Sequence, residues 1–183
     1  MRVRRRWIAL AALIIAIMLC GLTAVRWNRF LPYHWRKVDL PDAQFSISFP
    51  GNATASQDTY TASDGSKFIS SKLTSSPAKG VIYAVNWWDN SAQNDISTDE
   101  LFVSFRDCGM KAFGGRVVSE KKLTVQGYPA QDTAVLAAGG VVAVNRVIRI
   151  HSRLYSLWVI DRLGHLEKSD IKKFLDSFTV YST

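Results

Sequence analysis

The sequence lacks the residues and motifs that most enzymes need. It has only two cysteines, Cys20 and Cys108, and three histidines, His34, His151 and His165. It contains no HExxH pattern, no cysteine pair at metal spacing, no GxSxG elbow and no glycine-rich phosphate loop of the GxGxxG or GxxxxGK type. These absences argue against a catalytic residue set, a bound cofactor and a metal centre. We therefore predict that the chain is not an enzyme.

Acidic residues are missing from the first 37 positions, and this placement explains the formal net charge of +8. Residues 1–37 hold eight of the 23 Lys and Arg residues, so the remaining 15 match the 15 Asp and Glu residues of the rest of the chain. A nucleic-acid-binding domain concentrates positive charge on its own surface. Because the domain is neutral, we predict that it does not bind nucleic acid.

A long apolar run follows a basic head at residues 1–6. Trp7–Val25 has 19 residues and no charge. A helix of this length, at about 1.5 Å per residue, spans about 28 Å, close to the thickness of the hydrocarbon core of a bilayer. A cleaved signal peptide is the alternative, but its apolar region is usually shorter, and Leu22-Thr23-Ala24 is a poor cleavage site. We interpret residues 7–25 as a transmembrane helix that anchors the chain in the lipid bilayer.

The charges around the anchor predict its orientation. Arginines before the anchor are denser and closer to it than the basic residues that follow, which favours a single-pass protein of the cell membrane with a cytoplasmic N-terminus. Residues 26–37 are basic and aromatic, and we interpret them as a juxtamembrane linker lying on lipid headgroups. Beyond them, residues 38–183 form the predicted extracytoplasmic domain.

Alternation and turn residues predict strands in the first half of this domain. Residues 45–49 alternate between apolar and polar side chains and stop at Pro50-Gly51. Residues 54–62 and 67–74 flank a turn sequence and predict a hairpin. Residues 80–88 are apolar on both faces, which is typical of a strand inside a sheet.

A helix is predicted next. Ser97-Thr98-Asp99-Glu100 is a capping box that marks its start, and Gly114-Gly115 marks its end. One stripe of the helix carries Leu101, Phe105, Cys108 and Ala112, so we expect Cys108 to be a buried and inert thiol.

Strands and a second helix complete the predicted domain. Three or four strands are expected, at 116–126, 130–137, 141–151 and 153–161, with turns at Gly127-Tyr128-Pro129, Gly139-Gly140 and Ser152. The last helix is expected to begin near Ser169 and to bury Ile171, Phe174, Leu175 and Phe178, and residues 179–181 are compatible with an edge strand. This order predicts the α+β class, with an antiparallel sheet sandwiched by helices.

Four stretches of the domain together resemble a known family. They are Phe45-Ser-Ile-Ser-Phe-Pro50, Leu123-Thr-Val-Gln-Gly-Tyr-Pro-Ala130, Arg153-Leu-Tyr-Ser-Leu-Trp-Val159 and Ile171-Lys-Lys-Phe-Leu-Asp-Ser-Phe178. Their order and spacing resemble the PsbP/Mog1-like domains of uncharacterised bacterial proteins over roughly residues 38–181. The resemblance implies an antiparallel sheet sandwiched by helices and a mostly non-enzymatic role, as in a photosystem accessory subunit and a small-GTPase partner. It carries over no functional residue.

Two features are candidates for contact with a partner. Trp87-Trp88 ends a strand before a polar loop, and an exposed Trp88 is a natural hot spot, unless both rings lie in the core. Arg146, Arg149 and Arg153 surround the turn at Ser152 and are suited to an anionic partner, unless they form a solvated hairpin balanced by Asp161.

These observations favour a membrane-anchored, non-enzymatic module that docks on another envelope protein. The abundance of Phe and Trp also permits a second hypothesis, a small-ligand or lipid carrier with an apolar pocket between sheet and helix. Neither hypothesis requires a cofactor or a metal.

Overall fold

The fold is known from a computed structural model, which describes residues 34–61, 67–89, 96–162, 164 and 166–181. These residues form one compact unit that begins at His34. The predicted head, anchor and most of the predicted linker fall outside the described residues. No helix within the described residues is both long and apolar enough to span a bilayer.

The described elements alternate between strands and a few helices. In chain order they are β1 (Trp35–Leu40), β2 (Phe45–Pro50), β3 (Thr54–Thr61), β4 (Lys67–Ser75), β5 (Val81–Asp89), α2 (Thr98–Phe113), β6 (Arg116–Val125), β7 (Tyr128–Leu136), the 3₁₀ turn η2 (Ala138–Gly140), β8 (Val142–Ile150), β9 (Arg153–Asp161), α3 (Lys168–Asp176) and β10 (Thr179–Val180). The predicted α+β class is confirmed, because both sheets are antiparallel and two helices pack with them.

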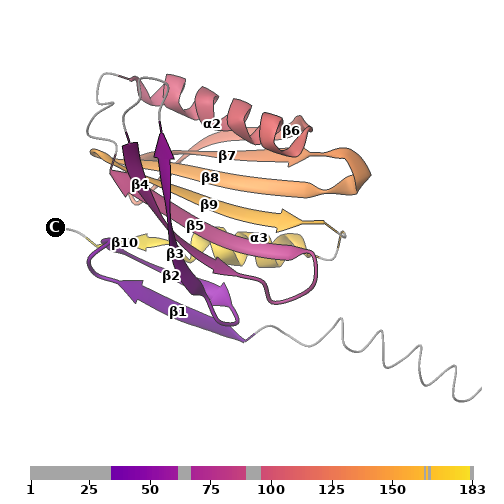
Figure 1. The fold of residues 1–183 in the computed structure, drawn as a ribbon, viewed down its shortest axis with the longest axis horizontal. Helices are drawn as coiled ribbons and strands as arrows, with labels where there is room; N and C mark the ends of the chain where they lie inside the picture. Colours follow the sequence, from indigo (N-terminus) through magenta and orange to yellow (C-terminus); the bar gives the residue numbers. More distant parts are fainter. Residues whose placement is uncertain (1–33, 62–66, 90–95, 163, 165, 182–183) are drawn as a thin grey trace, which may run out of the picture. The chain divides into compact units, whose positions relative to one another are not determined.

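The strands form two separate sheets (Figure 1). The larger sheet has seven strands in the order β3-β4-β5-β9-β8-β7-β6, and every neighbouring pair is antiparallel. Strand β5 lies inside this sheet between β4 and β9, as its two apolar faces predicted. The smaller sheet has three strands in the order β1-β2-β10, and the sequence did not predict it as a separate layer.

Helix α2 joins the middle of the large sheet to its far edge. The chain leaves β5, passes through α2, enters the edge strand β6, and returns by the meander β6-β7-β8-β9 until β9 pairs with β5. Ser97 caps α2 by accepting a hydrogen bond from the Glu100 amide, while the Glu100 carboxylate accepts one from the Ser97 amide. The helix ends at Gly114, which adopts the left-handed conformation that favours glycine.

The two faces of the large sheet are covered by different elements. Adjacent side chains of a strand point to opposite faces, and Trp87 and Trp88 of β5 illustrate this. The Trp87 ring meets Phe45 of the small sheet, with centroids 5.2 Å apart, whereas the Trp88 ring stacks on Phe105 of α2 at 5.4 Å. The small sheet and α3 therefore cover one face, and α2 covers part of the other.

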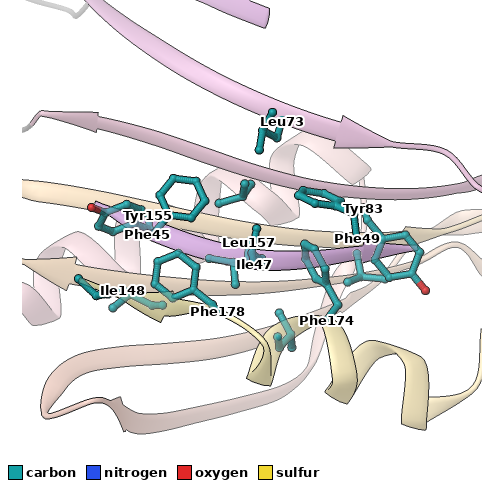
Figure 2. Packing of buried hydrophobic residues seen from close by; sticks show 14 of the residues in the cluster. Phe45, Ile47, Phe49, Leu73, Tyr83, Ile148, Tyr155, Leu157, Phe174 and Phe178 are labelled. Atoms are coloured by element: carbon teal, nitrogen blue, oxygen red, sulfur yellow. The ribbon is translucent and has the colours of Figure 1, made fainter. Parts of the chain in front are cut away.

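The hydrophobic core lies between the two sheets and is rich in aromatic rings (Figure 2). Phe45, Tyr155 and Phe178 form one group, with ring centroids 5.2 to 5.6 Å apart. In a second group Phe174 of α3 lies 5.3 Å from Phe49 and 5.2 Å from Tyr83. Phe174, Leu175 and Phe178 are buried as predicted, whereas Ile171 is only partly buried and Phe178 lies just beyond the end of α3.

Several local predictions were wrong. The N-cap of α3 is Glu167 rather than Ser169, and its side chain makes no capping hydrogen bond. The turn between β6 and β7 consists of Gln126 and Gly127, both at positive φ, so Tyr128 already belongs to β7. Strand β1 was not predicted, because the basic and aromatic stretch that includes Trp35 was interpreted as linker.

The buried face of α2 also differs from the predicted stripe. Leu101, Phe102 and Gly109 are buried, whereas Cys108 and Ala112 are exposed. Gly109 faces the sheet: a Cβ atom built there would lie 3.2 Å from the Trp158 ring. The buried side of α2 is therefore rotated from the predicted one, because Gly109, which has no side chain, forms the close contact with the sheet.

We predict that replacing Phe174 with Ala lowers the free energy of unfolding of the fragment 34–183 by about 3–4 kcal/mol, because the ring is completely buried between the sheets. Urea unfolding followed by tryptophan fluorescence measures the change. The matched control is Ile69→Ala, whose side chain is 60% exposed and whose loss is expected to stay within about 0.5 kcal/mol. Equal losses in the two variants would contradict the core assignment.

Candidate functional site

A groove lies between α3 and the strands β6 to β9, on the face of the large sheet that also carries the small sheet. Its volume is about 720 Å³, within the range of about 300–1,000 Å³ typical of small-molecule sites. The residues that line it come from both walls and include Leu123, Val142, Val144, Val159, Leu166, Ile171 and Leu175, together with Ser119, Lys121, Asp132, Thr133, Ala134, Arg146, Asp161, Gly164, Lys168, Lys172 and Asp176.

Branched aliphatic side chains form the floor of the groove. Val142 and Val144 point from β8, Leu123 contributes from β6, and Ile171 contributes from α3. Each of these side chains is only partly buried. On the same strand and the same face, Ile148 lies under the small sheet and is completely buried. The floor is thus the part of this sheet face that the small sheet and α3 leave open.

A charged network closes one end of the groove. Arg146 of β8 lies directly opposite Asp132 of β7 in the sheet register. Its Nε donates to Asp132 Oδ1 at 2.6 Å and its Nη2 donates to Asp132 Oδ2 at 2.8 Å. Its Nη1 donates to the Leu175 carbonyl and to Asp176 Oδ1, both at 3.1 Å. The guanidinium therefore joins the sheet to the C-terminal end of α3.

The network changes the protonation equilibria of its members. Burial opposes the charged form of Arg146, yet hydrogen bonds and charge attraction from Asp132 and Asp176 raise the pKa of the guanidinium above its ordinary value. Burial likewise opposes ionisation of Asp176, but hydrogen bonds from Lys172 and Arg146 lower the pKa of its carboxyl. Both groups are consequently charged at neutral pH.

The structure does not bring the predicted arginines together. Arg146 and Arg149 are three residues apart in β8, so their side chains lie on opposite faces of the sheet. Arg149 Nη1 donates to the Ile96 carbonyl at 2.7 Å, at the start of α2. Arg153 Nη1 donates to Gln44 Oε1 at 3.3 Å, in the turn between β1 and β2. Of the three, only Arg146 lines the groove, and its charge is balanced by Asp132 and Asp176 rather than by Asp161.

The other candidates lie away from the groove. Trp88 is partly buried against α2 and packs on Phe105. His151 is exposed in the turn between β8 and β9, where its ring meets Tyr128. His34 is exposed at the start of the described unit, and His165 is outside the described residues. Among the residues that the structure describes, no three of His, Cys, Asp and Glu come together as metal ligands.

Cys108 is exposed on α2, so the prediction of a buried thiol was wrong. The helix buries the adjacent Gly109 instead. This exposed thiol lies on the face of the large sheet opposite to the groove.

Sequence reasoning placed Val142, Val144 and Leu123 in strands and Ile171 on the buried stripe of the last helix, but it did not identify them as a site. The pattern Val142, Val144 and Arg146 marks one face of a strand, and Lys121 with Leu123 marks one face of another. The alternation shows that each of these strands has one face that carries both aliphatic and basic side chains. It does not show that β6, β7 and β8 lie side by side under the same helix.

The similarity of this chain to known proteins lies in its fold. No known family model matches the sequence, and no curated protein matches it. The solution structure of cyanobacterial PsbP (CyanoP) from Synechocystis sp. PCC 6803 has a TM-score of 0.57, with 10% identity, over 82% of this chain and 94% of that chain. A protein of unknown function from Pseudomonas aeruginosa has a TM-score of 0.50, with 12% identity, over 82% and 99% of the two chains. The domain therefore has a PsbP-like fold, as the four sequence stretches predicted.

We predict that Asp132→Ala destabilises the fragment 34–183 by about 2–3 kcal/mol, because it leaves a largely buried guanidinium without its two-point partner. The matched control is Asp58→Ala. It removes the ion pair with Lys72, whose side chains are 33% and 45% exposed, and its cost is expected to stay below about 1 kcal/mol. Urea unfolding at pH 7 measures both. A cost for Asp132→Ala no greater than that of the control would show that the network does not hold α3.

A pH dependence follows from the lowered pKa of Asp176. A carboxyl whose pKa is lower in the folded state adds stability above its unfolded pKa of about 3.9 and loses that contribution as the pH falls through the folded pKa. The difference in unfolding free energy between the wild type and Asp176→Asn is therefore expected at pH 7 and should disappear as the pH falls well below 4. Since the side chain is 42% exposed, the difference is small. A gap that stays constant down to pH 2.5 would contradict the assignment.

Proposed function

We propose that this chain, whose fold is that of PsbP, is a non-enzymatic accessory module anchored in the cell membrane with its domain outside the cytoplasm. The observation that carries the proposal is the pairing of a binding-type fold with a groove in which the buried Arg146 and its carboxylate partners are held in closed contacts. Arg146 and both of its carboxylate partners are engaged in the network. Such groups position the walls of the groove and are poorly suited to exchange protons with a substrate.

The membrane part of the proposal rests on the amino-acid sequence. The uncharged run of 19 residues from Trp7 to Val25 is long enough to cross a bilayer as a helix. The denser arginines before it favour a cytoplasmic N-terminus, which leaves the domain on the other side of the membrane. An envelope protein is the partner that such a tethered domain meets most readily.

The groove also supports a second candidate function, a carrier for a small apolar ligand or lipid. Its volume of about 720 Å³ and its aliphatic floor suit a ligand of that size. The groove lies between a helix and a sheet, the place that the second sequence hypothesis requires.

The exposed thiol of Cys108 allows the location of the domain to be tested directly. A membrane-impermeant maleimide added to spheroplasts is expected to label Cys108 to the same extent before and after lysis, because the thiol is exposed on α2. Mass spectrometry of the labelled peptide separates this site from Cys20, and Cys108→Ser is the control. Labelling that appears only after lysis would place the domain in the cytoplasm and contradict the proposal.

A further inference from the structure

The floor of the groove is an apolar surface that packs against the hydrophobic core on its inner side and borders the hollow on its outer side. Val142, Val144, Leu123, Leu166 and Ile171 are all partly buried and line a single hollow. Hollows lined mainly by apolar side chains with a few polar groups are the usual setting of small-ligand sites. The first feature that an occupant must have is therefore an apolar body.

The charges around the groove indicate which sign of charge a bound ligand would carry. The network of Arg146, Lys172, Asp132 and Asp176 contains two positive and two negative groups and has no net charge. Asp161 is only 5% exposed, and its Oδ2 accepts a hydrogen bond from the Leu166 amide at 3.0 Å. These groups therefore offer an incoming ligand little charge that is both exposed and unbalanced.

Two exposed lysines remain on the rim, Lys121 of β6 and Lys168 at the start of α3. Neither forms an ion pair with another described residue. Asp132 lies opposite Lys121 in the sheet, but both of its oxygens already accept hydrogen bonds from Arg146. The exposed charge that an occupant meets is therefore positive.

The dimensions of the groove suit one chain rather than two. The α3 wall has nine residues, which corresponds to about 13 Å of helix. The volume of about 720 Å³ is that of a single small ligand rather than of a diacyl lipid or a folded segment. The occupant is thus expected to be a slender molecule with a single apolar chain.

We propose that the groove binds a single-chain anionic amphiphile, with its apolar chain on Val142, Val144 and Ile171 and its acidic head beside Lys121 or Lys168. This assignment rests on the second candidate function and names its ligand class. A fatty acid and a lysophospholipid with a phosphate head share this chemistry, and the head group distinguishes them in the test below. An apolar peptide and a second copy of the chain are other occupants that the same experiment detects.

The test uses the full chain in phosphatidylcholine nanodiscs that contain a fatty acid with a photoactivatable diazirine in its chain. After irradiation and proteolysis, mass spectrometry is expected to locate adducts on peptides that contain Val142–Arg146 and Leu166–Lys173. A matched diazirine alcohol is expected to label these peptides at least about twofold less, because it lacks the charge that pairs with a lysine. A diazirine lysophospholipid with a phosphate head provides the third arm, and the stronger of the two anionic labels identifies the natural head group.

Variants with matched controls test the floor and the rim. Ile171→Glu, which introduces a carboxylate into the floor, is expected to reduce labelling roughly tenfold. Val103→Glu on the outer side of α2, where the side chain is 42% exposed, is expected to have no effect. Lys121→Glu or Lys168→Glu is expected to reduce labelling by the acid but not by the alcohol, and Lys79→Glu is the control for charge. If circular dichroism shows that Ile171→Glu is unfolded, Ile171→Ala replaces it. A smaller loss of labelling is then expected.

Four outcomes would overturn the proposal. The first is labelling confined to residues 7–25, and the second is equal labelling by the acid and the alcohol. The third is an unlabelled groove in a chain whose self-association, measured by light scattering, is lost in Ile171→Glu, since the occupant is then a second copy. The fourth is an unlabelled groove with a co-purifying mass, since the occupant is then a peptide. None of these outcomes affects the labelling of Cys108 in spheroplasts, so failure of the ligand assignment and failure of the proposed location are distinguishable.

Discussion

The position of the groove depends on one packing contact, the insertion of Phe174 between the two sheets. Its ring lies between Phe49 of β2 and Tyr83 of β5, and all three are completely buried. Aromatic side chains bury about 150–250 Å² each, so this contact carries a large share of the burial that holds α3 on the sheet. Because Phe174 fixes the rotation of the helix, Ile171 and Leu175 on its neighbouring side are directed at the open part of the sheet and line the groove.

Arg146 adds a second tie at the C-terminal end of the same helix, next to Phe174. The last carbonyls of an α-helix have no partner within the helix, and the Leu175 carbonyl finds one in the Arg146 guanidinium. A positive charge is also favourable near the negative end of the helix dipole. The planar guanidinium then matches Asp132 with two parallel hydrogen bonds, which an ammonium group cannot do. A charged residue stands in an otherwise apolar strand face because it joins the sheet to the helix.

The predictable parts of this fold are those that local chemistry determines. The capping box at Ser97 and most of the apolar stripe of α3 were predicted, because each depends on residues that are close together in the sequence. Strand β1 was missed because its partner β2 stabilises it, and nothing in its basic sequence indicates a strand. The network was missed for a similar reason: Asp132 and Asp176 are 14 and 30 residues from Arg146 in sequence. Contacts at such separations follow from the strand order, which sequence periodicity does not specify.

The edges of the large sheet are less suited to partners than the groove is. Strand β6 ends one side, and its exposed Glu120, Lys121 and Lys122 together with a register shift between Val117 and Ser119 oppose the addition of another strand. Strand β3 ends the other side, and its sequence, TASQDTYT, is polar. A partner that adds a strand to either edge therefore gains little apolar contact. The groove offers an aliphatic floor and two lysines that form no ion pair within the described part of the chain, so an occupant gains both burial and charge pairing there.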